Sequence, residues 1–142
     1  MKFLIFLLVI VAVVSARAET ECEKHRKREQ EHDAIGLVIP ECDENGDYKG
    51  LQCHKDHTFC QCWDKKGHAL TAPSRDIKAC ECPRAKAKAE RNAWSGDYIP
   101  QCRKDGTYER KQCWEWKKTC WCVDKDGKEL TEKTKEDVTC QE

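Results

Sequence analysis

Residues 53–62 read CHKDHTFCQC and residues 113–122 read CWEWKKTCWC, so the same three cysteine positions return after 60 residues. All twelve cysteines of the chain follow this offset, and seventeen of the sixty aligned positions are identical without a gap. The first set is Cys22, Cys42, Cys53, Cys60, Cys62 and Cys80, and the second is Cys82, Cys102, Cys113, Cys120, Cys122 and Cys140. Only Glu81 separates the two sets. The chain is therefore one cysteine-rich module written twice.

Residues 1–18 have the pattern of a secretory signal peptide. Lys2 precedes an apolar run at residues 3–14, and small residues offer cleavage after Ala16 or after Ala18. The apolar run is shorter than the roughly 20 residues that a membrane span needs. We expect a secreted, extracellular protein that has no membrane contact once the signal is removed.

In an oxidising compartment, an even number of regularly spaced cysteines indicates a disulfide framework. A structural zinc site is the alternative, and it is disfavoured because the chain has no Cys-x-x-Cys pair. Six cysteines allow about fifteen pairings in each unit. Cys60 and Cys62 flank a single residue and would close a very small ring, so we expect them to bond in opposite directions along the chain. No metal and no cofactor is predicted.

The charge balance argues against a polyanionic partner. The chain has 26 basic and 26 acidic residues, and removal of the signal through Ala18 takes away Lys2 and Arg17, which leaves 24 against 26. The basic runs at residues 24–28 and 84–88 are interpreted as solvated helix faces. We therefore predict no binding of nucleic acid.

The periodicity and turn residues predict a small α+β unit. Segments 23–33 and 83–93 are expected to form short helices that begin just after a cysteine. The turn sequences at residues 43–46 and 103–106 predict one hairpin in each unit, and those at 65–67 and 125–127 predict a second pair of strands. A sixty-residue unit buries little apolar surface, so covalent cross-links must supply much of its stability.

The second unit carries Tyr-Ile-Pro at residues 98–100, Gln-Cys at 112–113 and Cys-Trp-Cys-Val at 120–123. With the cysteine spacing, these motifs resemble those of the thyroglobulin type-1 domain. The resemblance spans residues 22–140 and predicts one domain at 22–80 and a second at 82–140. The first unit departs from the motif at Val38, Gln61 and Trp63, which stand in place of tyrosine, tryptophan and valine. Its aromatic residue is displaced by two positions, which keeps it on the same face of a strand.

The resemblance implies that the cysteines pair first with second, third with fourth and fifth with sixth in each unit. The pairs would enclose 19, 6 and 17 residues. Loops near 15 residues stabilise a fold by about 3 kcal/mol each on the chain-entropy model. Cross-links of this size rival the net stability of a small domain.

An enzyme is not predicted. No serine lies in a nucleophile motif, and all five histidines fall in the first unit. His54 and His57 lie three residues apart, but without a third ligand they are interpreted as part of an exposed polar loop rather than a metal site.

Some thyroglobulin type-1 domains, called thyropins, inhibit papain-like cysteine proteases. The resemblance implies that three loops form a wedge that enters the active-site cleft of the protease. By position these loops are residues 34–37, 54–59 and 73–78 in the first unit, and 94–97, 114–119 and 133–137 in the second. The candidate contact residues are Ala34, Ile35, Gly36, Leu37, His54, His57, Phe59, Ser74, Arg75, Trp94, Ser95, Gly96, Trp114 and Trp116.

We predict a monomer whose partner is a papain-like cysteine protease. The first unit is favoured as the inhibitor because its small edge, Ala34 to Gly36, suits a narrow cleft, whereas the second unit has the bulkier Trp94 there. Trp114 and Trp116 lie in a six-residue ring too small to bury both indoles, which predicts an interface role for the pair. The alternatives are aspartic protease inhibition by the second unit, and a noncatalytic binding or venom protein that blocks no protease.

Overall fold

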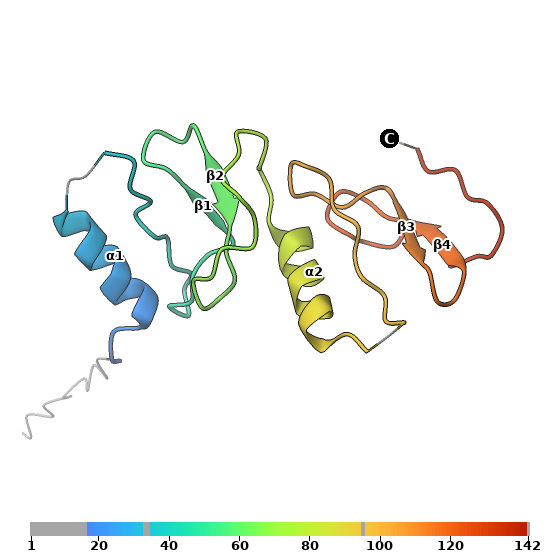
Figure 1. Cartoon of the computed structure of the whole chain (residues 1–142), viewed down its shortest axis with the longest axis horizontal. Coiled ribbons are helices and arrows are strands. Elements are labelled where there is room, and N and C mark those ends of the chain that lie inside the picture. Colours follow the sequence, from blue (N-terminus) through green and yellow to red (C-terminus); the bar gives the residue numbers. More distant parts are fainter. Residues whose placement is uncertain (1–16, 33–34, 95, 142) are drawn as a thin grey trace, which may run out of the picture.

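The computed structural model describes residues 17–32, 35–94 and 96–141. Residues 1–16 of the signal peptide expected at residues 1–18, and the candidate residues Ala34 and Ser95, lie outside the described residues. The two units follow one another along the long axis of the molecule, each with one helix and one two-stranded antiparallel sheet (Figure 1). The small disulfide-rich α+β architecture predicted from the sequence is confirmed. Within the described residues, no helix has the length and apolar character to cross a membrane.

The helices are α1 (Glu21–Glu31) and α2 (Glu81–Asn92). They begin before Cys22 and Cys82 rather than after them, so the sequence prediction placed their starts two residues too late. In α1 the start is set by a capping box, in which the Thr20 hydroxyl accepts from the Glu23 amide and the Glu23 carboxylate accepts from the Thr20 amide. The early start places Cys22 in the first turn of α1, where it is buried.

The sheets are formed by β1 (Leu51–Cys53) with β2 (Cys60–Cys62) and by β3 (Lys111–Trp114) with β4 (Thr119–Cys122). The turns predicted at residues 43–46, 65–67, 103–106 and 125–127 are present, but the predicted strand pairs around them are reduced to one isolated bridge at each turn. At the first turn the Asp43 carboxylate accepts hydrogen bonds from the amides of Asn45 and Asp47. These side-chain bonds close the turn locally and keep it compact.

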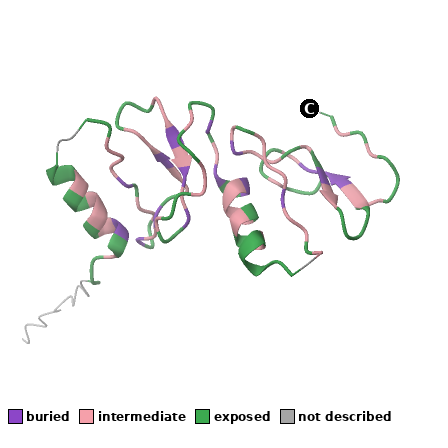
Figure 2. Cartoon of the chain, in the orientation of Figure 1, coloured by how far each residue is buried: buried purple, intermediate pink, exposed green. Residues whose placement is uncertain are grey.

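The described cysteines form six disulfides and none is free. The pairs are Cys22–Cys42, Cys53–Cys60, Cys62–Cys80, Cys82–Cys102, Cys113–Cys120 and Cys122–Cys140. This order agrees with the one that the family resemblance implies. In the first unit disulfide cysteines form much of the core, since Cys60, Cys62 and Cys80 cluster with Ile77. Figure 2 shows buried segments in the sheets and at the first turn of each helix.

A buried glutamine organises each unit. Gln52 and Gln112 are fully buried. The Gln52 amide group donates to the carbonyls of Glu41 and Lys49, while its oxygen accepts from the Glu41 amide, and Gln112 makes the same three bonds to Gln101 and Glu109. Each glutamine thereby connects the residue that follows Pro40 or Pro100 to the sheet. The oxygen and nitrogen of its side chain are both hydrogen-bonded.

The aromatic cluster lies at different places in the two units, because the first unit has its tryptophan at residue 63 and the second has it two positions earlier in the motif, at residue 121. In the second unit Trp121 is buried against Tyr98 with ring centroids 4.9 Å apart, and burial raises the pKa of the Tyr98 hydroxyl to about 12. In the first unit Trp63 lies instead beside Tyr48 and stacks on His25 of α1, with centroids 5.7 and 6.3 Å away. The first unit therefore supports its helix with aromatic contacts, and the second supports the segment that follows its helix.

Candidate functional site

In the first unit, the second and third candidate loops are held together. The Cys60 and Ser74 backbones exchange two hydrogen bonds of 2.9 and 2.8 Å. The Arg75 guanidinium lies 5.0 Å from the centroid of the Phe59 ring, and this ring is tilted toward His54 at 6.0 Å. A cation over an aromatic face is attractive, so these side chains join the two loops into one surface.

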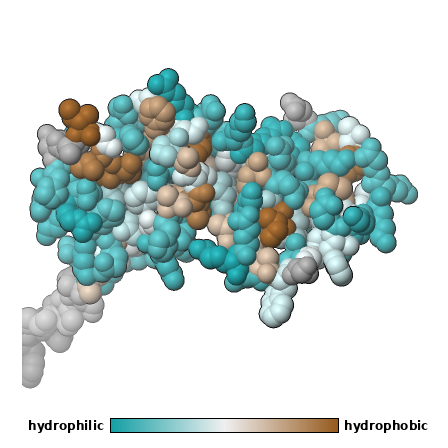
Figure 3. All heavy atoms as spheres, in the orientation of Figure 1, coloured by the Kyte–Doolittle hydropathy of each residue, from teal (hydrophilic) through white to brown (hydrophobic). Residues whose placement is uncertain are grey.

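The first loop of this unit presents an apolar, open tip. The Ile35 side chain is fully exposed, and Gly36 has φ +85° with no atom within 4 Å of the place where a Cβ would stand. Figure 3 shows hydrophobic atoms over the upper left of the first unit, where the chain leaves α1. An isoleucine in full contact with water gains by burial against a partner, which makes this tip a candidate anchor.

The histidines of the second loop lie at the two ends of its turn. The His57 amide donates to the His54 carbonyl at 2.8 Å, and His57 adopts φ 55°. The neighbouring Asp56 accepts from the Thr58 amide, and this bond holds the pKa of the Asp56 carboxyl below its usual range. Among the described residues, no three His, Cys, Asp or Glu side chains are placed to share a metal ion.

In the second unit, two tryptophans connect the first and second loops. The Trp114 indole N–H donates to the Gly96 carbonyl at 2.7 Å. The Trp116 ring packs on Gly96, where a Cβ would lie 3.0 Å from the indole. Glycine at residue 96 therefore lets the indole approach the backbone, and the two loops form one pinned edge.

The outer surface of this edge is aromatic. Trp94 and Trp116 are 85% and 73% exposed, whereas Trp114 is half-buried beneath the Lys117 ammonium, 4.2 Å from its ring centroid. The third loop is attached to β4, because the backbones of Thr134 in the loop and Cys120 in the strand exchange hydrogen bonds of 2.8 and 3.0 Å. The two indoles predicted to share an interface role thus lie in different environments, one supporting the edge and the other on its surface.

This difference gives a prediction for the second edge. Trp114→Phe keeps a ring but loses the N–H, so it is expected to release the Gly96 carbonyl and to cost about 1 kcal/mol of local stability. Amide hydrogen exchange of Asp97 should then become about fivefold faster. Trp94→Ala is the matched control, because it removes an exposed indole of the same edge and keeps both the Trp114 bond and the Trp116 ring on Gly96. Equal exchange rates in wild type and Trp114→Phe would contradict the supporting role.

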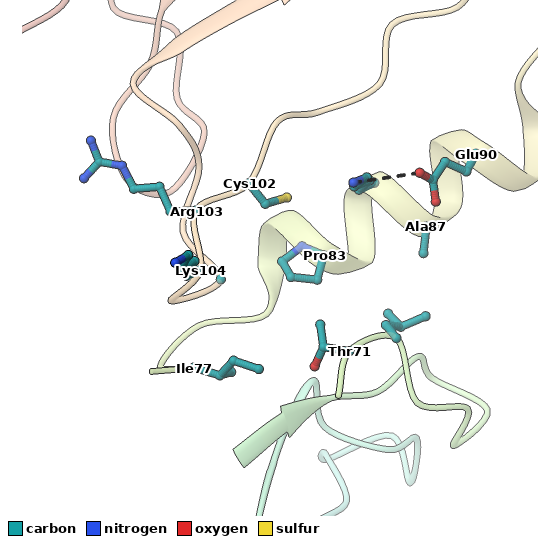
Figure 4. A pocket seen from close by; sticks show the side chains of 11 residues that line it. Thr71, Ile77, Pro83, Ala87, Glu90, Cys102, Arg103 and Lys104 are labelled. Carbon is teal, nitrogen blue, oxygen red and sulfur yellow. Dashed lines mark ion pairs between the residues drawn. The ribbon is translucent and has the colours of Figure 1, made fainter. Parts of the chain in front are cut away.

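A pocket of about 330 Å³ lies between the units, away from both edges. Figure 4 shows Pro83 and Ala87 of α2 on the side that faces Thr71 of the first unit. Its charged lining includes Lys86 and Glu90, which form an ion pair at 4.0 Å. The pocket is a seam where α2 meets the first unit, and the exposed loops rather than this seam form the candidate site.

Sequence reasoning did not assign a role to Gln52, Gln112 or Arg84. The two glutamines were visible as an identity between the copies, and a polar residue repeated beside a cysteine is a usable signal of a buried structural bond. Arg84 carried no such signal, because its partners are backbone carbonyls of the other unit.

The fold and its loops define a small repeat protein in which disulfides hold exposed loops on a minimal core. The family model described as thyroglobulin type-1 repeat matches residues 16–82 and again residues 80–141. The chain therefore belongs to the thyroglobulin type-1 repeat family.

Curated relatives extend this assignment over the whole chain. The protein named U20-hexatoxin-Hi1a, from Hadronyche infensa, is 42% identical over 143 residues, which cover 98% of this chain and 99% of the relative. U24-ctenitoxin-Pn1a, from Phoneutria nigriventer, is 43% identical and covers 81% of this chain and 90% of its own length. Equistatin, from Actinia equina, is 35% identical over 95 residues, which are 62% of this chain and 41% of equistatin.

Proposed function

We propose that the mature chain is an exported inhibitor of papain-like cysteine proteases, which it blocks by inserting an edge of loops into the active-site cleft. The observation that carries the proposal is the edge of the first unit. It combines the exposed tip at Ile35 and Gly36 with two further loops that are joined at Phe59 and Arg75. Family membership supports the same function, because thyropins share this fold.

The disulfides suit an inhibitor that must survive contact with a protease. The second loop of the first unit is closed by Cys53–Cys60, and the third loop lies between Cys62 and Cys80, which are also bonded. A loop that is stiff before binding loses little conformational entropy in the complex. It also opens less readily into the extended form that a protease cleaves. The edges would therefore bind as substrates do without being efficiently cut.

The first unit is the favoured inhibitor of papain-like enzymes. Its tip has no side chain at Gly36 and one apolar side chain at Ile35, so it is narrow. The corresponding tip of the second unit carries Trp94, and Trp116 lies close behind it on Gly96. This broader aromatic edge fits a narrow papain-like cleft less well than the first edge does, and inhibition of an aspartic protease is the specific alternative for the second unit.

The proposal is tested by titrating papain and cathepsin L with the refolded mature chain and measuring residual activity. Tight inhibition of both enzymes is expected, with trypsin unaffected. Pepsin in a parallel titration reports on the alternative for the second unit. If none of the four enzymes lost activity, the chain would be a noncatalytic binding protein, and the toxin names of two relatives would direct the search to a venom role without protease inhibition.

A further inference from the structure

The two units are joined by an arginine that reaches from the helix of one into the backbone of the other. Arg84 belongs to α2, the helix of the second unit. Its Nε donates to the Trp63 carbonyl at 2.7 Å, and its Nη2 donates to the Tyr48 carbonyl at 2.5 Å. Hydrogen bonds from a charged donor are stronger than neutral ones, and the planar guanidinium fixes direction as well as distance.

The first unit has a slot for this guanidinium. A Cβ on Gly50 would lie 3.1 Å from the Arg84 Nε, so a side chain there would crowd the arginine. The position equivalent to Gly50 in the second unit is Arg110, and the position equivalent to Arg84 in the first unit is Lys24. Gly50 and Arg84 contact each other, and at both positions the other copy of the repeat has a different residue. This is a fitted junction rather than a by-product of the shared fold.

Two more contacts close the junction. The amides of Lys78 and Ala79, at the end of the first unit, both donate to the Asp105 carbonyl in a turn of the second unit, at 2.8 and 3.0 Å. A Cβ on Gly106 would lie 1.6 Å from the Ala79 carbonyl oxygen, so the two backbones are in direct contact.

An ion pair spans the same junction. Arg91 of α2 lies 3.2 Å from the Asp64 carboxylate, whose side chain is 8% exposed. Burial opposes ionisation of Asp64, but hydrogen bonds from the amides of His68 and Lys66, from the His68 ring and from Arg91 outweigh it and hold the pKa of Asp64 below its usual range. With the Arg84 and Asp105 contacts, this pair leaves no free hinge at Glu81.

The junction also sets the direction of each edge. The first loop of each unit follows the C-terminal end of its helix, since α1 ends at Glu31 and α2 ends at Asn92. In Figure 1 α1 runs toward the upper edge of the molecule, whereas α2 runs toward the lower edge. The loops around residues 35–37 and 54–59 accordingly lie along the top of the first unit, and residues 94 and 96–97 lie at the bottom of the second.

We infer that the junction holds the two edges on opposite sides of one rigid body, so that a single chain binds two protease molecules at once. This inference rests on the proposed function. A protease of about 220 residues has a radius of gyration of about 17 Å, so two such enzymes would collide on a short chain whose edges faced the same way. Opposed edges remove that conflict without a flexible linker. The partner is therefore a pair of proteases, one seated on each unit.

The stoichiometry of the complex tests the inference. The mature chain is mixed with excess papain, and the mass of the complex is measured by light scattering after gel filtration. Two papain molecules for each chain are expected, falling to one with Ile35→Asp and to one with Trp94→Asp. One papain on the wild type and one on each variant would mean that the edges compete for a single place. One on the wild type and none on Ile35→Asp would mean that the second edge is idle. Either result overturns the inference while the proposed inhibition stands, whereas no complex at all overturns the proposed function itself.

Rigidity is measured separately, on the chain without protease. Backbone 15N relaxation should give one rotational correlation time for both units in the wild type and in the control Lys88→Ala, which changes α2 one turn from Arg84. The double variant Arg84→Ala, Arg91→Ala is expected to give two different correlation times. Independent tumbling of the units in the wild type would show that the junction does not hold, and would overturn the rigid arrangement even if two proteases bound.

Discussion

Replacing Gly106 with alanine is expected to lower the midpoint of thermal unfolding by more than about 10 °C, because the new methyl group meets a backbone atom of the other unit. The Cβ would lie 1.6 Å from the Ala79 carbonyl oxygen, and Gly106 has φ +86°. A left-handed conformation alone costs an alanine about 1–2 kcal/mol. The clash must be relieved by moving Lys78 and Ala79 away from Asp105, which brings the total to about 3 kcal/mol.

Gly36→Ala is the matched control for this prediction. Gly36 has φ +85°, almost the same as Gly106, but no atom lies within 4 Å of its Cβ position. Its substitution therefore reports the conformational cost without the clash, and a fall of about 4–8 °C is expected for each kcal/mol in a unit of this size. Both variants are followed by circular dichroism with the disulfides intact. Equal midpoints for the two variants would show that the contact between Gly106 and Ala79 contributes nothing to stability.

In a chain whose second edge is blocked by Trp94→Asp, the further change Ile35→Asp is expected to weaken papain inhibition by about 30-fold or more while leaving the fold equally stable. Ile35 is fully exposed in the free protein, so its replacement should change the free energy of unfolding by less than about 0.5 kcal/mol. Inside a protease cleft the same position loses water, and an unpaired carboxylate there costs at least about 2 kcal/mol. Inhibition constants from progress curves, with thermal unfolding run alongside, measure both effects.

Leu130→Asp provides the control for a new charge at an exposed apolar residue. Leu130 is 60% exposed, and it lies outside the three loops assigned to the second edge. Its variant should inhibit papain as the wild type does. If Ile35→Asp also kept an inhibition constant within about threefold of the Trp94→Asp chain, the first loop would not enter the cleft, and contact would have to be sought at Phe59 and Arg75.

Much of the fold could be predicted from the sequence because cysteines act as fixed points. Once two sets of six are aligned, the repeat, a helix near the first cysteine of each unit and a small sheet follow from local signals, although the helices begin two residues earlier than predicted. The predicted hairpins at residues 43–46 and 65–67 were overestimated, since a turn sequence reveals where the chain reverses and not how far a ladder runs. Within the two turns the carboxylates of Asp43 and Asp64 accept amide hydrogen bonds, and this local closure is not visible in the sequence.

The junction could not be predicted for a different reason. Arg84 donates to main-chain carbonyls, which every residue possesses, so no complementary side chain in the sequence points to it. The separate roles of Trp114 and Trp116 were equally hidden. Their spacing places two indoles in a short loop, but only the position of Gly96 decides that one donates a hydrogen bond and the other remains in water.

The Cys53–Cys60 bridge has a consequence for what happens if a protease cuts the chain between these two cysteines. Hydrolysis of one peptide bond within residues 54–59 releases no fragment, because both new chain ends stay attached through the disulfide. The severed ends remain at a high effective concentration beside each other, which favours resealing of the bond over departure of the pieces. A nicked molecule would keep its place on the enzyme, and damage to the loop would not by itself restore proteolysis.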